Sequence, residues 1–178
     1  IGIGADAGYA VTTGEQGTFV GSLAGDAITT GNINVALGYA ALSTATINAA
    51  NVAIGGQALL NMNNTTTANT FNTAVGYNAG VAVTTGVQNT LIGGQAGDNI
   101  TTGGENTIVG YDIAANAVGA VRQVLIGSNF TAGGDNAVRI GTSVGLATLA
   151  LDGSDTSWAA TSDERLKKDI TDSTVGLS

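Results

Sequence analysis

The feature that most constrains the fold is a repeat of seventeen residues. A glycine that follows a branched aliphatic residue recurs along the chain, and we call these residues the anchor glycines: Gly4, Gly21, Gly38, Gly55, Gly76, Gly93, Gly110, Gly127 and Gly141. Their spacings are 17, 17, 17, 21, 17, 17, 17 and 14 residues. The longest spacing holds a Thr- and Asn-rich insertion in Asn61–Asn69, which predicts a surface loop. A unit this short cannot bury its own apolar face, so the repeat predicts the stacked coils of a β-solenoid.

Several positions of the repeat are apolar, and their spacing predicts which side chains point inward. The residue before each anchor glycine is Ile, Val or Leu in every coil, and we expect it to form an inward stack. The residue three after is Ala in the first six coils, and the residue seven after forms a second apolar stack: Val11, Ile28, Ala45, Met62, Val83, Ile100 and Ala117. The residue two before the glycine is also apolar in places, as in Phe19 and Leu91. Successive strand residues alternate in direction, so we expect this last column to face outward and to need a cover.

An asparagine stands four residues before five of the anchor glycines, at Asn34, Asn51, Asn72, Asn89 and Asn106. Such a row could hold an ion or a sugar. Stacked β structures, however, favour ladders in which each amide bonds to the next coil. We therefore expect a structural role for these five residues.

The residue after the anchor glycine alternates between tyrosine and glycine in the middle of the chain: Tyr39, Gly56, Tyr77, Gly94 and Tyr111. A ring beside a bare glycine backbone can cover the neighbouring coil. The same row could also offer aromatic platforms for sugar rings. Structural covering is the favoured interpretation, with Tyr39, Tyr77 and Tyr111 as candidate binding residues.

Composition excludes several classes of function. The 178 residues include no Cys and no His, which excludes thiol nucleophiles, disulfide scaffolds, zinc fingers and the Ser-His-Asp triad. The net charge is −8 and no Lys or Arg precedes Arg122, so nucleic acid is not expected as a partner. No metal or cofactor is expected, and no apolar run is long enough for insertion into a membrane.

Acidic and threonine residues argue against two further activities. Asp26 and Asp98 share a column of the repeat but lie four coils apart, too far for the paired carboxylates of a glycosidase. The Thr pairs sit in turns and skip some coils, which disfavours an ice-binding solenoid. We therefore do not expect an enzyme.

A thin coil with few aromatic residues gives a small core, so assembly should supply the rest of the stability. We expect an all-β solenoid or β-roll of seventeen-residue coils, assembled as a parallel homotrimeric fibre. An interwoven triple β-helix is the alternative.

Two features of the sequence, the repeat and a segment near the end, resemble known families. The coils at 72–80 and 89–97 resemble repeats of trimeric autotransporter adhesin heads and of phage tail-fibre shafts. The segment from Trp158 to Ile170 resembles the junction at which phage tail fibres and tailspikes join an endosialidase-type intramolecular chaperone. That resemblance implies trimerisation templated by the chaperone, followed by a cut between Ser162 and Asp163, with Lys167 as the partner of the serine. Lys168 is a neighbouring candidate.

The resemblance divides the chain into a repeat shaft at 1–141, a terminal β segment at 142–161 and the start of a chaperone domain at 162–178, which is too short to be complete. It implies a structural and adhesive tail-fibre segment of a phage or phage-like injection particle, located on the virion and extracellular. The expected partners are further copies of the chain, other tail or baseplate proteins, and a polysaccharide or protein receptor on the host surface. Asn61–Asn69 and Ser128–Gly134 are candidate receptor regions. The alternatives are a trimeric bacterial surface adhesin and, less favoured, an ice- or glycan-binding solenoid.

Overall fold

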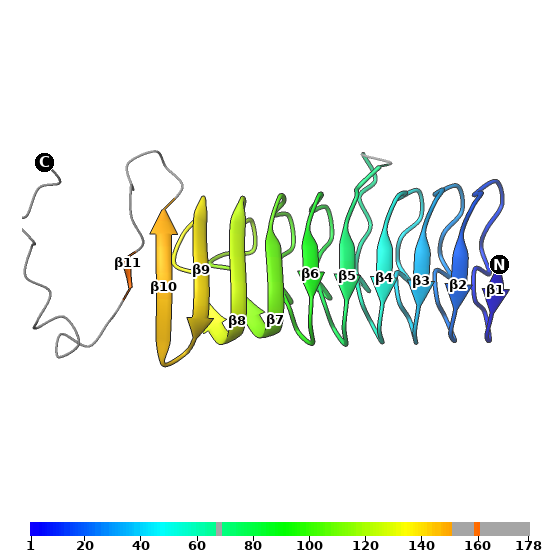
Figure 1. Cartoon of the computed structure of the whole chain (residues 1–178). Helices are drawn as coiled ribbons and strands as arrows, with labels where there is room; N and C mark the ends of the chain where they lie inside the picture. Colours follow the sequence, from blue (N-terminus) through cyan, green and yellow to red (C-terminus); the bar gives the residue numbers. More distant parts are fainter. Residues whose placement is uncertain (67–68, 151–158, 161–178) are drawn as a thin grey trace, which may run out of the picture.

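A computed structural model of the chain describes residues 1–66, 69–150 and 159–160. These residues form no helix and build one sheet of eleven strands whose order follows the sequence (Figure 1). The strands are β1 (Gly2–Ile3), β2 (Thr18–Val20), β3 (Val35–Leu37), β4 (Val52–Ile54), β5 (Thr73–Val75), β6 (Thr90–Ile92), β7 (Thr107–Ala114), β8 (Gln123–Thr131), β9 (Ala137–Thr142), β10 (Gly145–Ala150) and β11 (Ala159–Ala160).

Strands β1 to β9 pair in parallel, one strand per coil, and the register follows the repeat. Ala36 of β3, for example, pairs with Phe19 of β2 on one side and with Ala53 of β4 on the other. The turns between the strands are also bonded from coil to coil, as where the Thr12 amide donates to the Thr29 carbonyl at 3.0 Å. The result is a rod in which each coil of the chain stacks on the next. The prediction of an all-β solenoid is confirmed.

The core is built from four columns of inward side chains. The residues three and seven after the anchor glycine are buried in the interior coils, as expected, although Ala7 and Val11 are only partly covered in the first coil and Ala117 is exposed. The ladder asparagines form the third column. The fourth is the column two before the anchor glycine: Phe19, Ala36, Ala53, Ala74, Leu91, Ile108 and Leu125.

This fourth column corrects the sequence-based expectation. Leu91 is fully buried, whereas Ile92 is 39% exposed. The expected inward stack before the glycine therefore faces outward, and the column expected outside is inside. Successive side chains of a strand point to opposite faces. Asn89 and Leu91 are two residues apart and therefore share the inner face, and Ile92 points outward.

Side-chain size in this column is matched by the residue four after the anchor glycine. A side chain built on Gly25 would meet the ring of Phe19, at 2.5 Å from its Cδ1 atom, and one on Gly97 would meet Leu91 at 2.8 Å from Cδ2. In the coils of Ala36 and Ala53, Leu42 and Leu59 stand at this position instead and are fully buried. The coil of Ala74 has Gly80 there, and the side chains of Leu91 and Leu59 from the two neighbouring coils fill the space beside it.

The last coils differ from the rest of the rod. Strands β7 and β8 continue through their anchor glycines, so Ser128–Thr131, within the candidate receptor region at 128–134, belongs to β8; Asn129 in it has a left-handed φ of 52°. Arg139 takes the inward strand position in β9, and its guanidinium donates to the Thr131 carbonyl at 3.2 Å. Strand β10, within the expected terminal β segment, returns antiparallel to β9.

The insertion in Asn61–Asn69 is not wholly a surface loop. Asn61, Thr65 and Thr66 are exposed, but Asn64 is 4% exposed and its side chain donates to the Thr85 carbonyl at 3.0 Å. Part of the insertion is therefore packed into the coil.

Candidate functional site

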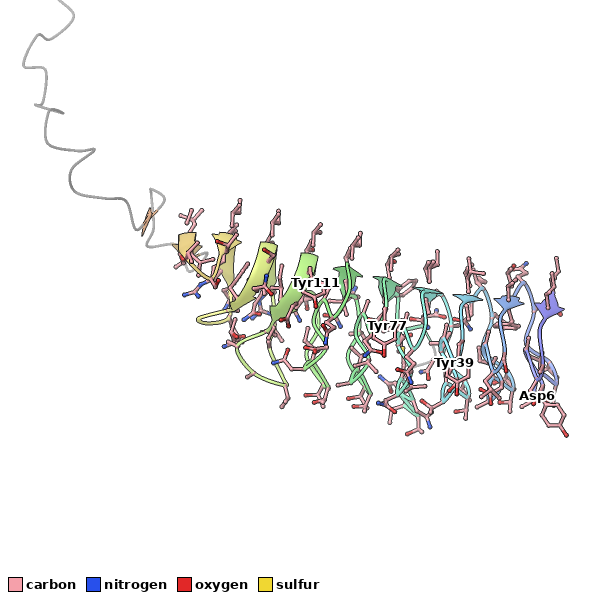
Figure 2. The ribbon with its side chains drawn as sticks, turned by 90° about the horizontal axis from the view of Figure 1, so that it is seen from below. Asp6, Tyr39, Tyr77 and Tyr111 are labelled. Atoms are coloured by element: carbon pink, nitrogen blue, oxygen red, sulfur yellow. The ribbon has the colours of Figure 1, made fainter. Side chains whose placement is uncertain are left out.

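The outer face of the sheet carries a continuous row of aliphatic side chains, which we call the outer stripe: Ile3, Val20, Leu37, Ile54, Val75, Ile92, Val109, Ile126 and Ile140. The five most exposed members are 39–60% exposed. Figure 2 shows carbon side chains that stand out from the strands along the whole rod, on the side away from the turns. At about 4.8 Å per strand, the stripe runs for about 40 Å.

The neighbouring column on this outer face, three residues before the glycine, is also β-branched and uncharged: Thr18, Val35, Val52, Thr73, Thr90, Thr107, Val124 and Val138. The two columns together make a flat apolar surface without a charged side chain. Patches of this extent on soluble proteins mark interaction surfaces.

A second row, formed by Tyr39, Tyr77 and Tyr111, lies on the turn side of the anchor glycines. The three side chains are 56–62% exposed and follow one line along the rod, on a different side from the outer stripe (Figure 2). A Cβ atom on Gly56 would stand 3.5 Å from Cδ2 of Tyr77, and one on Gly94 would stand 3.4 Å from Cδ2 of Tyr111. Each of these two rings therefore lies beside the glycine of the preceding coil and leans in the same direction.

The backbone under the tyrosine row is bonded from coil to coil. The carbonyl of Tyr39 accepts from the Gln57 amide at 2.8 Å, and the carbonyl of Tyr77 accepts from the Gln95 amide at 2.9 Å. Gln57 and Gln95 are in the left-handed conformation and stand beside the row, together with Asn78 and Asp112. The site thus combines regularly placed rings with amide and carboxylate groups.

The five ladder asparagines form the expected kind of bonds with one another. Oδ1 of Asn72 accepts from the Asn89 backbone amide at 2.9 Å and from its side-chain amide at 3.1 Å. Oδ1 of Asn89 accepts in the same way from Asn106, and Gln123 continues the row. The asparagines are 0–1% exposed, and their side-chain donors and acceptors are used within the rod. The ladder is therefore internal and offers no surface to a ligand.

Sequence reasoning missed two pairs of acids. Burial of the carboxyl group raises the pKa of Asp26 and of Asp98, and the neighbouring acids Asp6 and Asp112 add smaller effects in the same direction. Backbone hydrogen bonds partly oppose both shifts. The partners stand in different columns, two and five residues after their anchor glycines, so a search for acids within one column does not find them.

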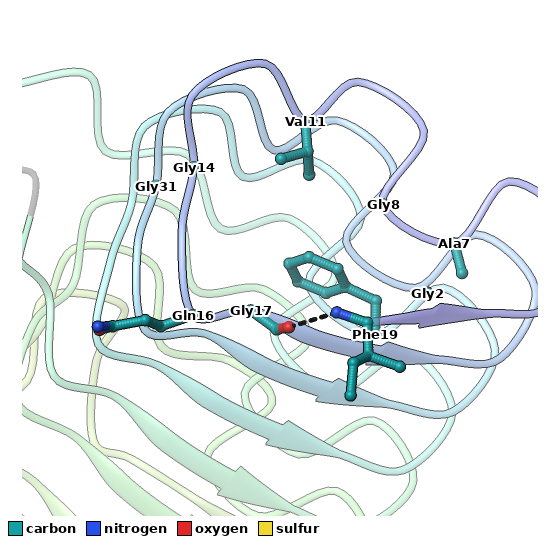
Figure 3. A pocket seen from close by; sticks show the side chains of 10 residues that line it. Gly2, Ala7, Gly8, Val11, Gly14, Gln16, Gly17, Phe19 and Gly31 are labelled. Carbon is teal, nitrogen blue, oxygen red and sulfur yellow. Dashed lines mark hydrogen bonds between the residues drawn. The ribbon is translucent and has the colours of Figure 1, made fainter.

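A pocket of about 220 Å³ lies at the N-terminal end of the rod, over the ring of Phe19 (Figure 3). Ala7 and Val11 line it together with several glycines. The equivalent residues of the next coil, Ala24 and Ile28, are fully buried. The pocket is thus the uncovered end of the core rather than a shaped ligand site.

The expected cleavage junction, Ser162, Asp163 and Lys167 with the neighbouring Lys168, lies outside the described residues. Across the part of the chain that the structure describes, no group of three or more acidic residues could hold a metal ion. A search of the same residues finds no helix with the length and apolar character needed to cross a membrane.

The outer stripe and the tyrosine row are two regular rows of exposed side chains along the rod. No protein-family model, no curated protein and no solved structure matches the chain.

Proposed function

We propose that the protein is a structural and adhesive segment of an extracellular fibre, in which three parallel copies of the rod pack through their outer stripes. The observation that carries this proposal is the stripe itself: nine aliphatic side chains in line on an uncharged sheet face. Exposure of such a surface to water is costly, and burial gains about 25 cal/mol for each Å² of apolar area.

Another copy of the chain is the partner that fits this surface. A parallel copy in register has the same coil spacing, so its aliphatic residues meet those of its neighbour at every coil. A partner with another pitch would match only a few coils. The acidic pairs at Asp6 and Asp26 and at Asp98 and Asp112 lie after the anchor glycines, away from the stripe columns, so identical charges are not brought together there.

The mass of the protein in solution tests the assembly. We expect sedimentation equilibrium to give three times the chain mass of 17.4 kDa. Replacement of Ile54 and Ile92 by Asn should shift the protein toward monomer, because two amides would enter each apolar interface. The matched control replaces Thr85 and Thr102, which are exposed in the turns, by Asn as well, and it should leave the mass unchanged. A monomeric unmodified protein, or equal masses for both variants, would contradict the proposal.

The finer proposal is a phage-type tail fibre that is trimerised by a self-releasing C-terminal chaperone. The resemblance of residues 158–170 to the chaperone junction supports it. Intact mass spectrometry of the product of the complete gene tests it. We expect a chain that ends at Ser162, and a Ser162→Ala variant that remains uncut. An uncut unmodified product would favour the second candidate, a trimeric surface adhesin, for which the resemblance of residues 72–80 and 89–97 is the supporting observation.

A further inference from the structure

The geometry points to an occupant for the tyrosine row: a neutral, extended polysaccharide that lies along the rod and places every second sugar on a tyrosine. This inference rests on the proposed function, since it gives the chemical class of the surface that the fibre would contact. It uses Tyr39, Tyr77 and Tyr111 and the amide side chains beside them.

The first argument is the spacing. Neighbouring tyrosines are two coils apart, which at the spacing of paired strands is about 10 Å. In an extended chain of β-1,4-linked pyranoses, successive units are turned over, so that the same ring face recurs once in every two units. That recurrence has nearly the length of two coils. The glycines at 56 and 94 add no side chain of their own between the tyrosines, and the rings of Tyr77 and Tyr111 lie beside them, so a linear chain would meet ring surface there.

The second argument is the state of the rings. Solvent exposure of 56–62% leaves much of each ring free for contact, while the neighbouring glycine supports the other part. Such a ring loses little conformational freedom when a ligand binds. The C–H groups of a pyranose face can pack on an aromatic ring. Gln57 and Gln95 directly follow the two glycines of the row and are half-buried, and we expect their amides to bond the hydroxyl groups of an intervening sugar.

The third argument concerns charge. Among the residues that the structure describes, the basic side chains are Arg122 and Arg139, which donate to Asn136 and to the Thr131 carbonyl, whereas Asp112 is an exposed acid next to Tyr111. An anionic glycan would be repelled. The polysaccharide that fits is therefore uncharged.

Calorimetric titration with three probes tests the inference. Cellohexaose is neutral, extended and longer than the row, maltohexaose has the same composition but a curved α-1,4 chain, and cellobiose can reach only one tyrosine. We expect cellohexaose to bind at least about tenfold more tightly than either of the others, because only it can contact three rings at once. Equal affinity for the two hexasaccharides, or no heat from cellohexaose at millimolar concentration, would overturn the proposal.

Two variants test the residues and their period. Tyr77→Ala should weaken cellohexaose binding about tenfold, whereas Tyr9→Ala, which removes an 81% exposed tyrosine outside the row, should not change it. The double variant Gly56→Tyr with Tyr77→Gly keeps three tyrosines but breaks the two-coil spacing, and it should bind as weakly as Tyr77→Ala. Unchanged binding by the double variant would show that the period is not recognised and would overturn the inference.

The sedimentation mass of every variant separates the two proposals. Loss of binding by Tyr77→Ala at an unchanged mass supports the role of the tyrosine row. Binding by a protein that is monomeric would leave the tyrosine inference standing while the proposed assembly fails. A fall in mass of Tyr77→Ala would assign the row to the assembly and overturn the inference.

Discussion

At the scale of single residues, the anchor glycines have a backbone conformation that side chains do not tolerate. Their φ angles lie between 124° and 148°. The chain turns there from the sheet into the corner, and the anchor glycines of consecutive coils stack backbone to backbone. A Cβ atom on Gly38 would stand 2.6 Å from the carbonyl carbon of Gly55. Both the conformation and the close approach therefore require glycine at this position.

Gly38→Ala should accordingly lower the free energy of unfolding by about 3 kcal/mol or more, from backbone strain and the clash combined. The control is Gly56→Ala, because the nearest atom to its Cβ, in the ring of Tyr77, is 3.5 Å away and its φ is outside the left-handed region. We expect that variant to change stability by less than about 1 kcal/mol. Chemical denaturation of both variants makes the comparison, and similar losses would contradict the proposed strain at the anchor position.

Among the strand elements, hydrophobicity alone could not tell the inside from the outside. The columns one and two residues before the anchor glycine are both apolar, and uniform size favours the first of them for the core. The structure instead buries the second column, which contains Ala as well as the larger Leu, Ile and Phe. The ladder asparagines show which face of the strand is the inner one, because they are buried. Once Asn89 is inside, Leu91 must be inside as well, because the side-chain period of a strand is two.

The corrected sidedness predicts opposite behaviour for two adjacent residues of β6. Leu91→Ala should cost about 2–5 kcal/mol of unfolding free energy, since it leaves a cavity in the core. Ile92→Ala should leave the fold of the single rod nearly unchanged and instead weaken association between copies. Denaturation together with sedimentation mass distinguishes the two effects. A larger loss of fold stability from Ile92→Ala in the monomer would restore the original assignment of the columns.

More of the architecture than of the candidate sites could be predicted from the sequence. The seventeen-residue spacing determines the coils and their register, because each depends only on the position within the repeat. The acid pairs escaped prediction, since Asp98 and Asp112 come from different columns and meet only because adjacent coils fold over one another. The sequence predicts an exposed apolar column two residues before the anchor glycine, but the exposed column lies one residue before it.

At the scale of the whole molecule, the chain carries a net charge of −8, and four of its acidic residues form the two acid pairs. Burial and a neighbouring acid each disfavour the ionised form of Asp26 and of Asp98, so their pKa values in the folded rod are above the ordinary 3.8. Between 3.8 and the raised pKa, the folded rod binds more protons than the unfolded chain. The free energy of unfolding therefore falls as the pH rises through this range, and the stabilisation is complete only below 3.8.

Lowering the pH from 7 toward 4 should thus raise the thermal midpoint of the rod, contrary to the acid sensitivity of proteins whose carboxylates are paired with bases. Asp98→Asn should reduce this gain, because the variant has no proton to take up at this position. Glu105→Gln removes an exposed acid of the same charge and should leave the effect of Asp98 in place. Thermal unfolding at a series of pH values, at constant ionic strength, gives the three curves. If the two variants reduced the pH dependence equally, the response would come from net charge rather than from the pair of Asp98 and Asp112.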